Sequence, residues 1–156
     1  SEFDLINKGA ELAFGLNNIY KETRYDDKKN INNSWAIRTY RERKTGLPII
    51  SISAPSTDPD KRRANSADTY KFFFEKYDVK SGEKLLLVTN QIYVPYQQLE
   101  AIRTLAVPYG VIVETVGLPN EWTNQTQVKR GADKYLQEIR STVQAMSRFL
   151  QYYNKN

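Results

Sequence analysis

The chain has 156 residues, of which 40% are hydrophobic and 26% charged, an ordinary composition for one globular domain with a sizeable core. It contains no cysteine and no histidine, which excludes thiol nucleophiles, disulfides, a Ser-His-Asp triad and any histidine metal ligand within the chain. Acid–base chemistry would therefore need Asp, Glu, Lys or Tyr. The net charge of +5 comes from charges that alternate in sign, so it indicates a solvated basic surface and no strong nucleic-acid signal.

No apolar run is long enough to span a membrane and no signal peptide is visible, so we expect no membrane segment and take the cytoplasm as the default location. The opening residues Ser1-Glu2-Phe3 resemble a vector scar. We therefore expect the sequence to be an excised piece of a longer protein, folded as a single α/β domain over residues 1–156.

The first half of the chain mixes helices, polar loops and one strand. Its pattern predicts a helix over residues 5–20, a polar loop or linker over 21–33, a helix over 34–44, a strand over 47–53, a loop over 54–64 and a helix over 66–77. Ser34 sets the start of the second helix, because serine is a preferred N-cap residue, and Gly46 sets its end.

The middle of the chain predicts a βαβ unit. A buried strand over 85–88 leads through a polar turn into an amphipathic helix from about Pro95, and a second strand over 111–116 ends at Gly117. With the strand at 47–53, this unit predicts a three-layer α/β/α sandwich with a Rossmann-like, mostly parallel sheet. Three strands are few for such a sheet. Either the polar segment hides a strand or further strands precede the sequence, and we favour the second interpretation.

Residues 126–153 predict one long amphipathic helix. Its apolar residues recur at helical spacing: Val128, Ala132, Leu136, Ile139, Val143, Met146, Leu150 and Tyr153. The main interpretation is that this apolar face packs on the sheet. The alternative is the interface of a homo-oligomer, because the helix is longer than a compact sheet needs to cover it.

The polar loop before the helix at 66–77 holds the first group of candidate site residues. They are the ligand-binding candidates Arg62, Arg63, Asn65 and Ser66 and the catalytic candidate Asp68. Free N–H groups at a helix start and arginine side chains both favour anions, which predicts a phosphate-binding corner. In the structural alternative, Asn65 or Ser66 caps the helix, Asp68 is a favourable first-turn charge and the arginines are solvated.

The carboxyl end of the strand at 85–88 holds the second group, since ligands bind at this edge of open α/β sheets. The ligand-binding candidates are Thr89, Asn90 and Tyr96, and Tyr93 is a catalytic candidate. Packing is the alternative role for the two tyrosines. Glu114 on the next strand is a further catalytic candidate, although strand alternation points it to the surface.

Short motifs make residues 34–118 similar to the SanA/ElyC/YdcF family of bacterial α/β domains. The run Asn65-Ser66-Ala67-Asp68-Thr69 matches an Asn-Thr-x-Glu-Asn helix start, and Val88-Thr89-Asn90 matches a Val-Thr-Ser turn. The resemblance implies a Rossmann-like parallel sheet, a pocket at the strand ends, and nucleotide-like ligands or a role in envelope biogenesis. Tyr93 and Tyr96 stand where the family has His and Arg, so a reaction that needs that His is lost here or uses Tyr93.

Together these patterns predict binding, with turnover left open, of a phosphate-bearing small molecule such as a nucleotide or a sugar phosphate. The alternative is a non-catalytic protein-interaction module from a larger effector or envelope protein, which suits the absence of His and Cys. Asp58 and Asp60 are only a weak indication of a cation, so we expect no metal site. The sequence names no cofactor.

Overall fold

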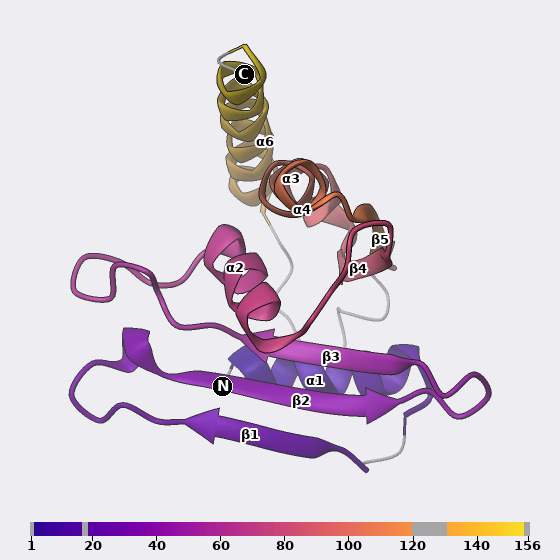
Figure 1. The fold of residues 1–156 in the computed structure, drawn as a ribbon. Helices are drawn as coiled ribbons and strands as arrows, with labels where there is room; N and C mark the ends of the chain where they lie inside the picture. The colour runs from indigo at the N-terminus through magenta and orange to yellow at the C-terminus, as the bar shows by residue number, and fades with distance from the viewer. Residues whose placement is uncertain (1, 17–18, 120–130, 155–156) are drawn as a thin grey trace. The chain divides into compact units, whose positions relative to one another are not determined.

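The computed structural model of the chain describes residues 2–16, 19–119 and 131–154. The chain divides into two compact units, Ser1–Lys76 and Tyr77–Asn156, each with its own sheet and helices (Figure 1). The sequence predicts a single domain over residues 1–156, and this remains a prediction. The beginning of the predicted C-terminal helix, residues 126–130, lies outside the described residues.

The first unit is an antiparallel sheet with helices packed on it. In chain order its elements are α1 (Glu2–Ala13), β1 (Lys21–Tyr25), the 3-10 helix η1 (Ile31–Asn33), β2 (Trp35–Arg41), β3 (Pro48–Ser53) and α2 (Ser66–Lys76). The strand order is β1-β2-β3, and both pairs are antiparallel. The predicted strand at 47–53 and helix at 66–77 are confirmed, whereas α1 ends at Ala13 rather than at Tyr20.

Two predictions for this unit are wrong. Residues 34–44 contain the strand β2 rather than a helix, and the polar segment 21–33 contains β1 and η1 rather than a loop alone. Strand β2 forms because it pairs with a neighbour along each edge, which satisfies its backbone groups as a helix would. Ser34 is not the N-cap of a helix: it follows η1 as its C-cap, and its Oγ accepts a hydrogen bond from the N–H of Asp27 at 2.9 Å.

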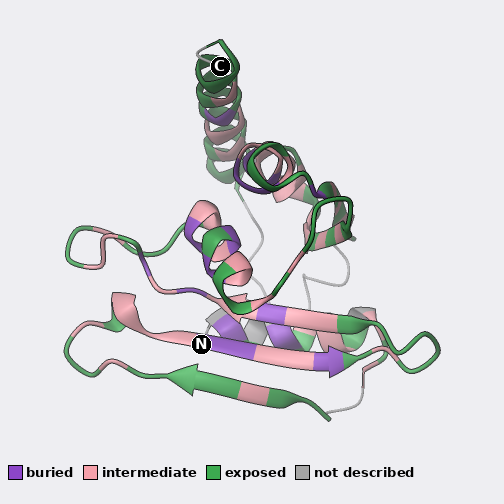
Figure 2. Ribbon diagram, viewed as in Figure 1, coloured by how far each residue is buried: buried purple, intermediate pink, exposed green. Residues whose placement is uncertain are grey.

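The two helices of the first unit cover opposite faces of its sheet. Tyr40 on β2 reaches α1, where its hydroxyl lies 3.1 Å from Asn7 Oδ1. Trp35, an odd-numbered residue of the same strand, packs on Phe72 of α2 with ring centroids 5.5 Å apart. Successive side chains of a strand point to opposite faces, so the core of this unit lies in two layers against β2 (Figures 1 and 2).

The second unit contains the βαβ motif. Its elements are β4 (Lys84–Asn90), the 3-10 helix η2 (Gln91–Tyr93), α3 (Val94–Ala101), the π-helical turn η3 (Ile102–Ala106), α4 (Val107–Tyr109), β5 (Ile112–Leu118) and α6 (Ala132–Tyr153). Strands β4 and β5 are parallel, with Lys84 opposite Ile112 and Asn90 opposite Leu118. The predicted strand–helix–strand order is therefore confirmed.

The helical run between β4 and β5 changes its hydrogen bonding just before Pro108. Proline has no N–H and its ring crowds the carbonyl four residues earlier, so the helix widens into the π turn η3. Gly110 then ends the run with a φ of +68°, a left-handed conformation that glycine adopts without strain. This turn brings the chain back alongside β4.

The chain is a mixed α/β protein, as its sequence predicts. Its described strands form an antiparallel sheet of three and a parallel sheet of two. They do not establish the mostly parallel, Rossmann-like sandwich. Two strands are additional to the three predicted ones: β2 replaces the predicted helix over 34–44, and β1 lies inside the polar segment, the interpretation that was not favoured.

Candidate functional site

The predicted anion-binding corner lies at the start of α2. Asn65 Oδ1 accepts a hydrogen bond from the N–H of Asp68 at 3.0 Å, and Asp68 Oδ2 accepts one from the N–H of Asn65 at 2.9 Å. This reciprocal pair is a capping box, which satisfies two N–H groups that the first helical turn leaves free. The geometry therefore agrees with the structural alternative, in which Asn65 is the cap.

Asp68 also balances the charge of this corner. Its side chain is 3% exposed and accepts hydrogen bonds from the Arg62 guanidinium at 2.5 and 3.1 Å and from the Thr57 hydroxyl at 2.7 Å. Burial alone would raise the pKa of Asp68, but the hydrogen bonds from Arg62, the Asn65 N–H and Thr57 outweigh it and hold the pKa below its usual value. A carboxylate stabilised in this way is a weak base, which disfavours the catalytic role suggested for Asp68.

The same contacts occupy the groups that would bind an external anion. The helix N-terminus and the Arg62 guanidinium both face a carboxylate of the chain itself. A phosphate would have to displace Asp68 to reach them. Arg63 is exposed on the loop, and Ser66 is half-buried as the first residue of α2. Phosphate binding at this corner thus stays a prediction.

The second group of candidate residues lies at the carboxyl ends of β4 and β5. Thr89 is opposite Gly117 in the parallel register, and Asn90 is the last residue of β4. Tyr93 ends η2 and Tyr96 lies in the first turn of α3, and both are half-buried. The structure thus gathers four of the predicted residues around one strand end.

Glu114 does not belong to this group. It is the third residue of β5, opposite Leu86 of β4, and it is exposed as alternation predicts. The arginine corner lies in the first unit and the strand ends lie in the second. A joint site made of both groups therefore stays a prediction.

The apolar face of α6 is the largest departure from the sequence analysis. The helix contacts α3, and its one buried residue is Ala145. The apolar residues with heptad spacing are instead 50% to 71% exposed; they are Leu136, Ile139, Val143, Met146, Leu150 and Tyr153, named the α6 stripe from here on. The interpretation that this face packs on the sheet is wrong (Figure 2). The oligomer-interface alternative stays a prediction.

The parallel sheet of the second unit has a similar bare face. Residues that alternate along its strands and point away from α3 are exposed: Leu86, Val88, Ile112 and Val116. Parallel sheets in globular proteins are normally covered on both faces, because their strands are apolar on both sides. The second unit thus exposes apolar groups on a helix and on a sheet.

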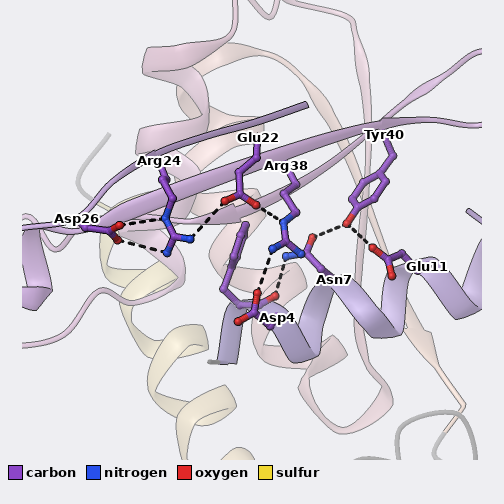
Figure 3. A network of polar contacts seen from close by, with 9 residues as sticks. Asp4, Asn7, Glu11, Glu22, Arg24, Asp26, Arg38 and Tyr40 are labelled. Atoms are coloured by element: carbon purple, nitrogen blue, oxygen red, sulfur yellow. Dashed lines mark hydrogen bonds and ion pairs between the residues drawn. The ribbon is translucent and has the colours of Figure 1, made fainter. Parts of the chain in front are cut away.

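Sequence reasoning missed a polar network that joins α1 to the sheet of the first unit (Figure 3). The guanidinium of Arg38 donates to Asp4 Oδ1 on α1 at 3.1 Å and pairs with Glu22 on β1. Its carbon Cζ also lies 4.6 Å from the centroid of the Tyr20 ring and 5.2 Å from that of Phe3. Burial alone would lower the pKa of Arg38, but the hydrogen bonds with Glu22 and Tyr40, together with the charge of Glu22, outweigh it and raise the pKa.

Tyr40 is the second member of that network. Its hydroxyl is directed at Asn7 Oδ1 at 3.1 Å and at Glu11 Oε1 at 3.0 Å, and the residue is 1% exposed. Burial, together with the bond to Glu11, raises the pKa of Tyr40 to about 12. The only sequence signal was the alternation of residues 35–41, which the helix prediction concealed. We assign the network a structural role, because it clamps α1 onto β2.

The described residues contain no group of three or more Asp or Glu residues placed to hold a metal ion. None of the helices in these residues has the length and apolar character that crossing a membrane requires.

Comparison with known proteins finds relatives in mycobacteria. The chain is 36% identical over 157 aligned residues to uncharacterised proteins of Mycobacterium bovis and Mycobacterium tuberculosis. The alignment covers 97% of this chain but 43% of each relative, so the chain spans less than half of their length. No family model matches the chain, and no solved structure matches it. The SanA/ElyC/YdcF resemblance therefore stays a prediction.

Proposed function

We propose that the chain is a protein-interaction module and that the α6 stripe is its contact surface for another helix. The observation that carries the proposal is that α6 leaves its most apolar face exposed, although a helix normally buries that face against its own domain. The apolar stripe of α6 is exposed, whereas the better-buried side of the helix carries the small Ala145, the half-buried hydroxyl residues Ser141 and Thr142 and one large apolar residue, the half-buried Phe149. Monomeric proteins rarely leave a continuous apolar strip of this kind in water.

The spacing of the stripe indicates what kind of partner fits it. Its residues are separated alternately by three and four positions, which is the heptad repeat of a coiled-coil seam. Successive residues of a helix are rotated by about 100°, so the stripe lies about a third of a turn away from Ala145. A partner helix can therefore lie along the stripe beside α3.

The apolar area is sufficient to support association. Fully burying a large aliphatic side chain contributes about 1.5–3 kcal/mol, and the six residues of the stripe are more than half exposed on average. Covering them would contribute about 7 kcal/mol, and a partner with an equal face would double this to about 14 kcal/mol. Association costs about 4–15 kcal/mol in lost freedom, so a helix with a matching apolar face is required.

A synthetic helix tests the proposal directly. The probe is a fluorescent three-heptad peptide with Leu at a and d and Glu at e and g, so that like charges prevent it from pairing with itself. We expect it to bind the chain, and we expect Val143→Asp to weaken binding at least about tenfold, because the new carboxylate would be buried in the seam.

The matched control is Gln144→Asp, which adds the same charge at an exposed position beside the stripe. Binding to this variant should equal binding to the original chain. A peptide that fails to bind, or that binds the Val143→Asp and Gln144→Asp variants equally, would show that the stripe is not a helix-binding surface.

We also propose, as a second candidate, that a phosphate-bearing small molecule binds at the carboxyl ends of β4 and β5. The parallel pairing supports it, because it places Thr89 and Asn90 at the edge where open α/β sheets bind ligands. A thermal-shift panel of nucleotides and sugar phosphates tests it. A ligand at about 100 times its Kd stabilises by about 2.7 kcal/mol, and Asn90→Ala should remove that shift. A flat panel with the folded chain would contradict this candidate.

A further inference from the structure

We infer that the helix that covers the α6 stripe is α6 of a second copy of the chain, in antiparallel orientation. The inference rests on the proposed function, since it names the partner of the same surface. It concerns the described helix Ala132–Tyr153 and requires no other element of the chain.

The stripe is complementary to itself when two copies run in opposite directions. Leu136, Val143 and Leu150 occupy the a positions of the heptad, and Ile139, Met146 and Tyr153 occupy the d positions. In an antiparallel pair each a residue lies opposite a d residue. One register then pairs Leu136 with Tyr153, Ile139 with Leu150 and Val143 with Met146, and it leaves no residue of the stripe uncovered.

The choice of side chains argues against the parallel orientation. Two-stranded parallel coiled coils favour a β-branched residue at a and leucine at d. Here leucine fills two of the three a positions, and isoleucine stands at a d position. The antiparallel pair avoids this mismatch because it mixes a and d in every layer, and it also opposes the two helix dipoles favourably.

The positions that flank the stripe are compatible with self-pairing. In the antiparallel register, Arg140 of one copy lies opposite Ser147 of the other, and Asp133 lies opposite Asn154. Like charges face each other at neither pair, so nothing in the flanks opposes association. The symmetric pairing also closes on itself, which gives a dimer rather than an open chain of molecules.

A rival occupant exists, because the mycobacterial relatives are more than twice as long as the aligned region. If the additional sequence of such proteins covers the stripe, this chain on its own is a monomer. The first measurement is therefore the mass in solution by sedimentation velocity over a range of concentrations. We expect a species of twice the 18.1 kDa chain mass. Val143→Asp should raise the dimer dissociation constant by about 100-fold, since both copies carry the change, and Gln144→Asp should leave it unchanged.

Orientation is tested by cross-linking, which is clean because the chain has no cysteine. We would mix two single-cysteine variants, Ile139→Cys and Leu150→Cys, oxidise them and identify the products by peptide mapping. The antiparallel register places residue 139 of one copy against residue 150 of the other, so a mixed disulfide is expected. A parallel pair would instead give two separate homodisulfides, and that result would overturn the inference.

The outcomes separate this inference from the proposed function. A chain that is monomeric at all concentrations but still binds the acidic heptad peptide keeps the interaction module and overturns the self-pairing. A dimer that persists in Val143→Asp overturns the self-pairing through the stripe. A monomer that also fails to bind the peptide overturns both.

Discussion

Replacing Asp68 with alanine should destabilise the first unit, because this buried carboxylate ties the start of α2 to two segments of the preceding loop. The variant loses its part of the capping box, and N-cap interactions contribute about 1 kcal/mol each. It also loses the hydrogen bond from Thr57, and a bond to a charged group contributes about 1.5–3 kcal/mol. Water can replace the carboxylate at Arg62, whose side chain is 39% exposed. We therefore expect the free energy of unfolding to fall by about 2.5–4 kcal/mol.

The assay is urea unfolding of the first unit, followed by the fluorescence of Trp35, whose ring packs on Phe72 of α2. A Trp122→Phe background leaves Trp35 as the only tryptophan. The control is Asp58→Ala, which removes the same charge from the loop before α2 and breaks a surface ion pair with Lys61, of side-chain exposures 43% and 80%. Its effect should stay below about 0.5 kcal/mol. Equal effects of Asp68→Ala and Asp58→Ala would refute the reasoning.

The dependence on pH provides an independent check. The contacts lower the pKa of Asp68 in the folded state, so its stabilisation is present above the unfolded pKa and is lost as the pH falls through the folded pKa. The stability difference between the chain and Asp68→Ala should therefore be constant from about pH 5 to 8 and shrink below about pH 4. If the stability difference instead shrank as the pH rose from 5 to 7, the pKa of Asp68 in the folded state would be raised. That result would restore Asp68 as a candidate base.

The remaining predictions concern two other buried contacts. Tyr40→Phe should lower the free energy of unfolding by about 1–2 kcal/mol, because it removes the hydroxyl that lies between the buried Asn7 Oδ1 and the half-buried Glu11 carboxylate, whereas Tyr25→Phe, at a half-exposed site, should be neutral in urea unfolding. The raised Tyr40 pKa of about 12 means that the difference between the chain and Tyr40→Phe is full below about pH 10 and disappears as the pH rises through 12. Gly117→Ala should cost about 1–3 kcal/mol, because its Cβ would come too close to the backbone Cα and to the side chain of Gln91, as thermal unfolding can show. Gly9→Ala should instead raise the free energy of unfolding by about 0.5–1 kcal/mol, since that helical site has room for a methyl group. Stability changes of the same sign in the two variants would contradict the prediction.

The elements that the sequence predicts correctly are those with local signals. The helix at 66–77 begins at a capping box whose two residues, Asn65 and Asp68, are three positions apart in the sequence. The βαβ unit follows from two apolar strands separated by one helical run, which ends at Gly110. Such signals need no knowledge of distant partners.

The incorrect elements depend on contacts between distant residues. Strand β1 (Lys21–Tyr25) is polar and exposed, and only its pairing with β2 makes it a strand. Just before β2, Ser34 resembles a helix cap, while the alternation of Trp35–Arg41 indicates a strand. Local propensity could not decide between them, because the outcome depends on β1 and β3 at its two edges.

The candidate site shows the same limit at the level of chemistry. The sequence placed Arg62 and Asp68 in the same corner. It allowed two interpretations of that corner, a phosphate-binding site and a capped helix start. Only the distances show that the carboxylate accepts hydrogen bonds from both the arginine and the helix N-terminus. A residue type that binds phosphate equally binds a carboxylate of its own chain, so composition alone could not distinguish the two.

The α6 stripe shows a different limit of sequence patterns. Heptad spacing identified the apolar residues of this helix correctly, but it could not state which surface would cover them. A globular helix normally buries its most apolar face against its own domain. Here α6 contacts α3, buries Ala145 and half-buries Phe149, and keeps the six side chains of the α6 stripe mostly exposed. Because hydrophobic burial is the main favourable term in folding and in association alike, a stripe that folding leaves exposed is available for association. This is the physical reason to test α6 before the predicted ligand pocket.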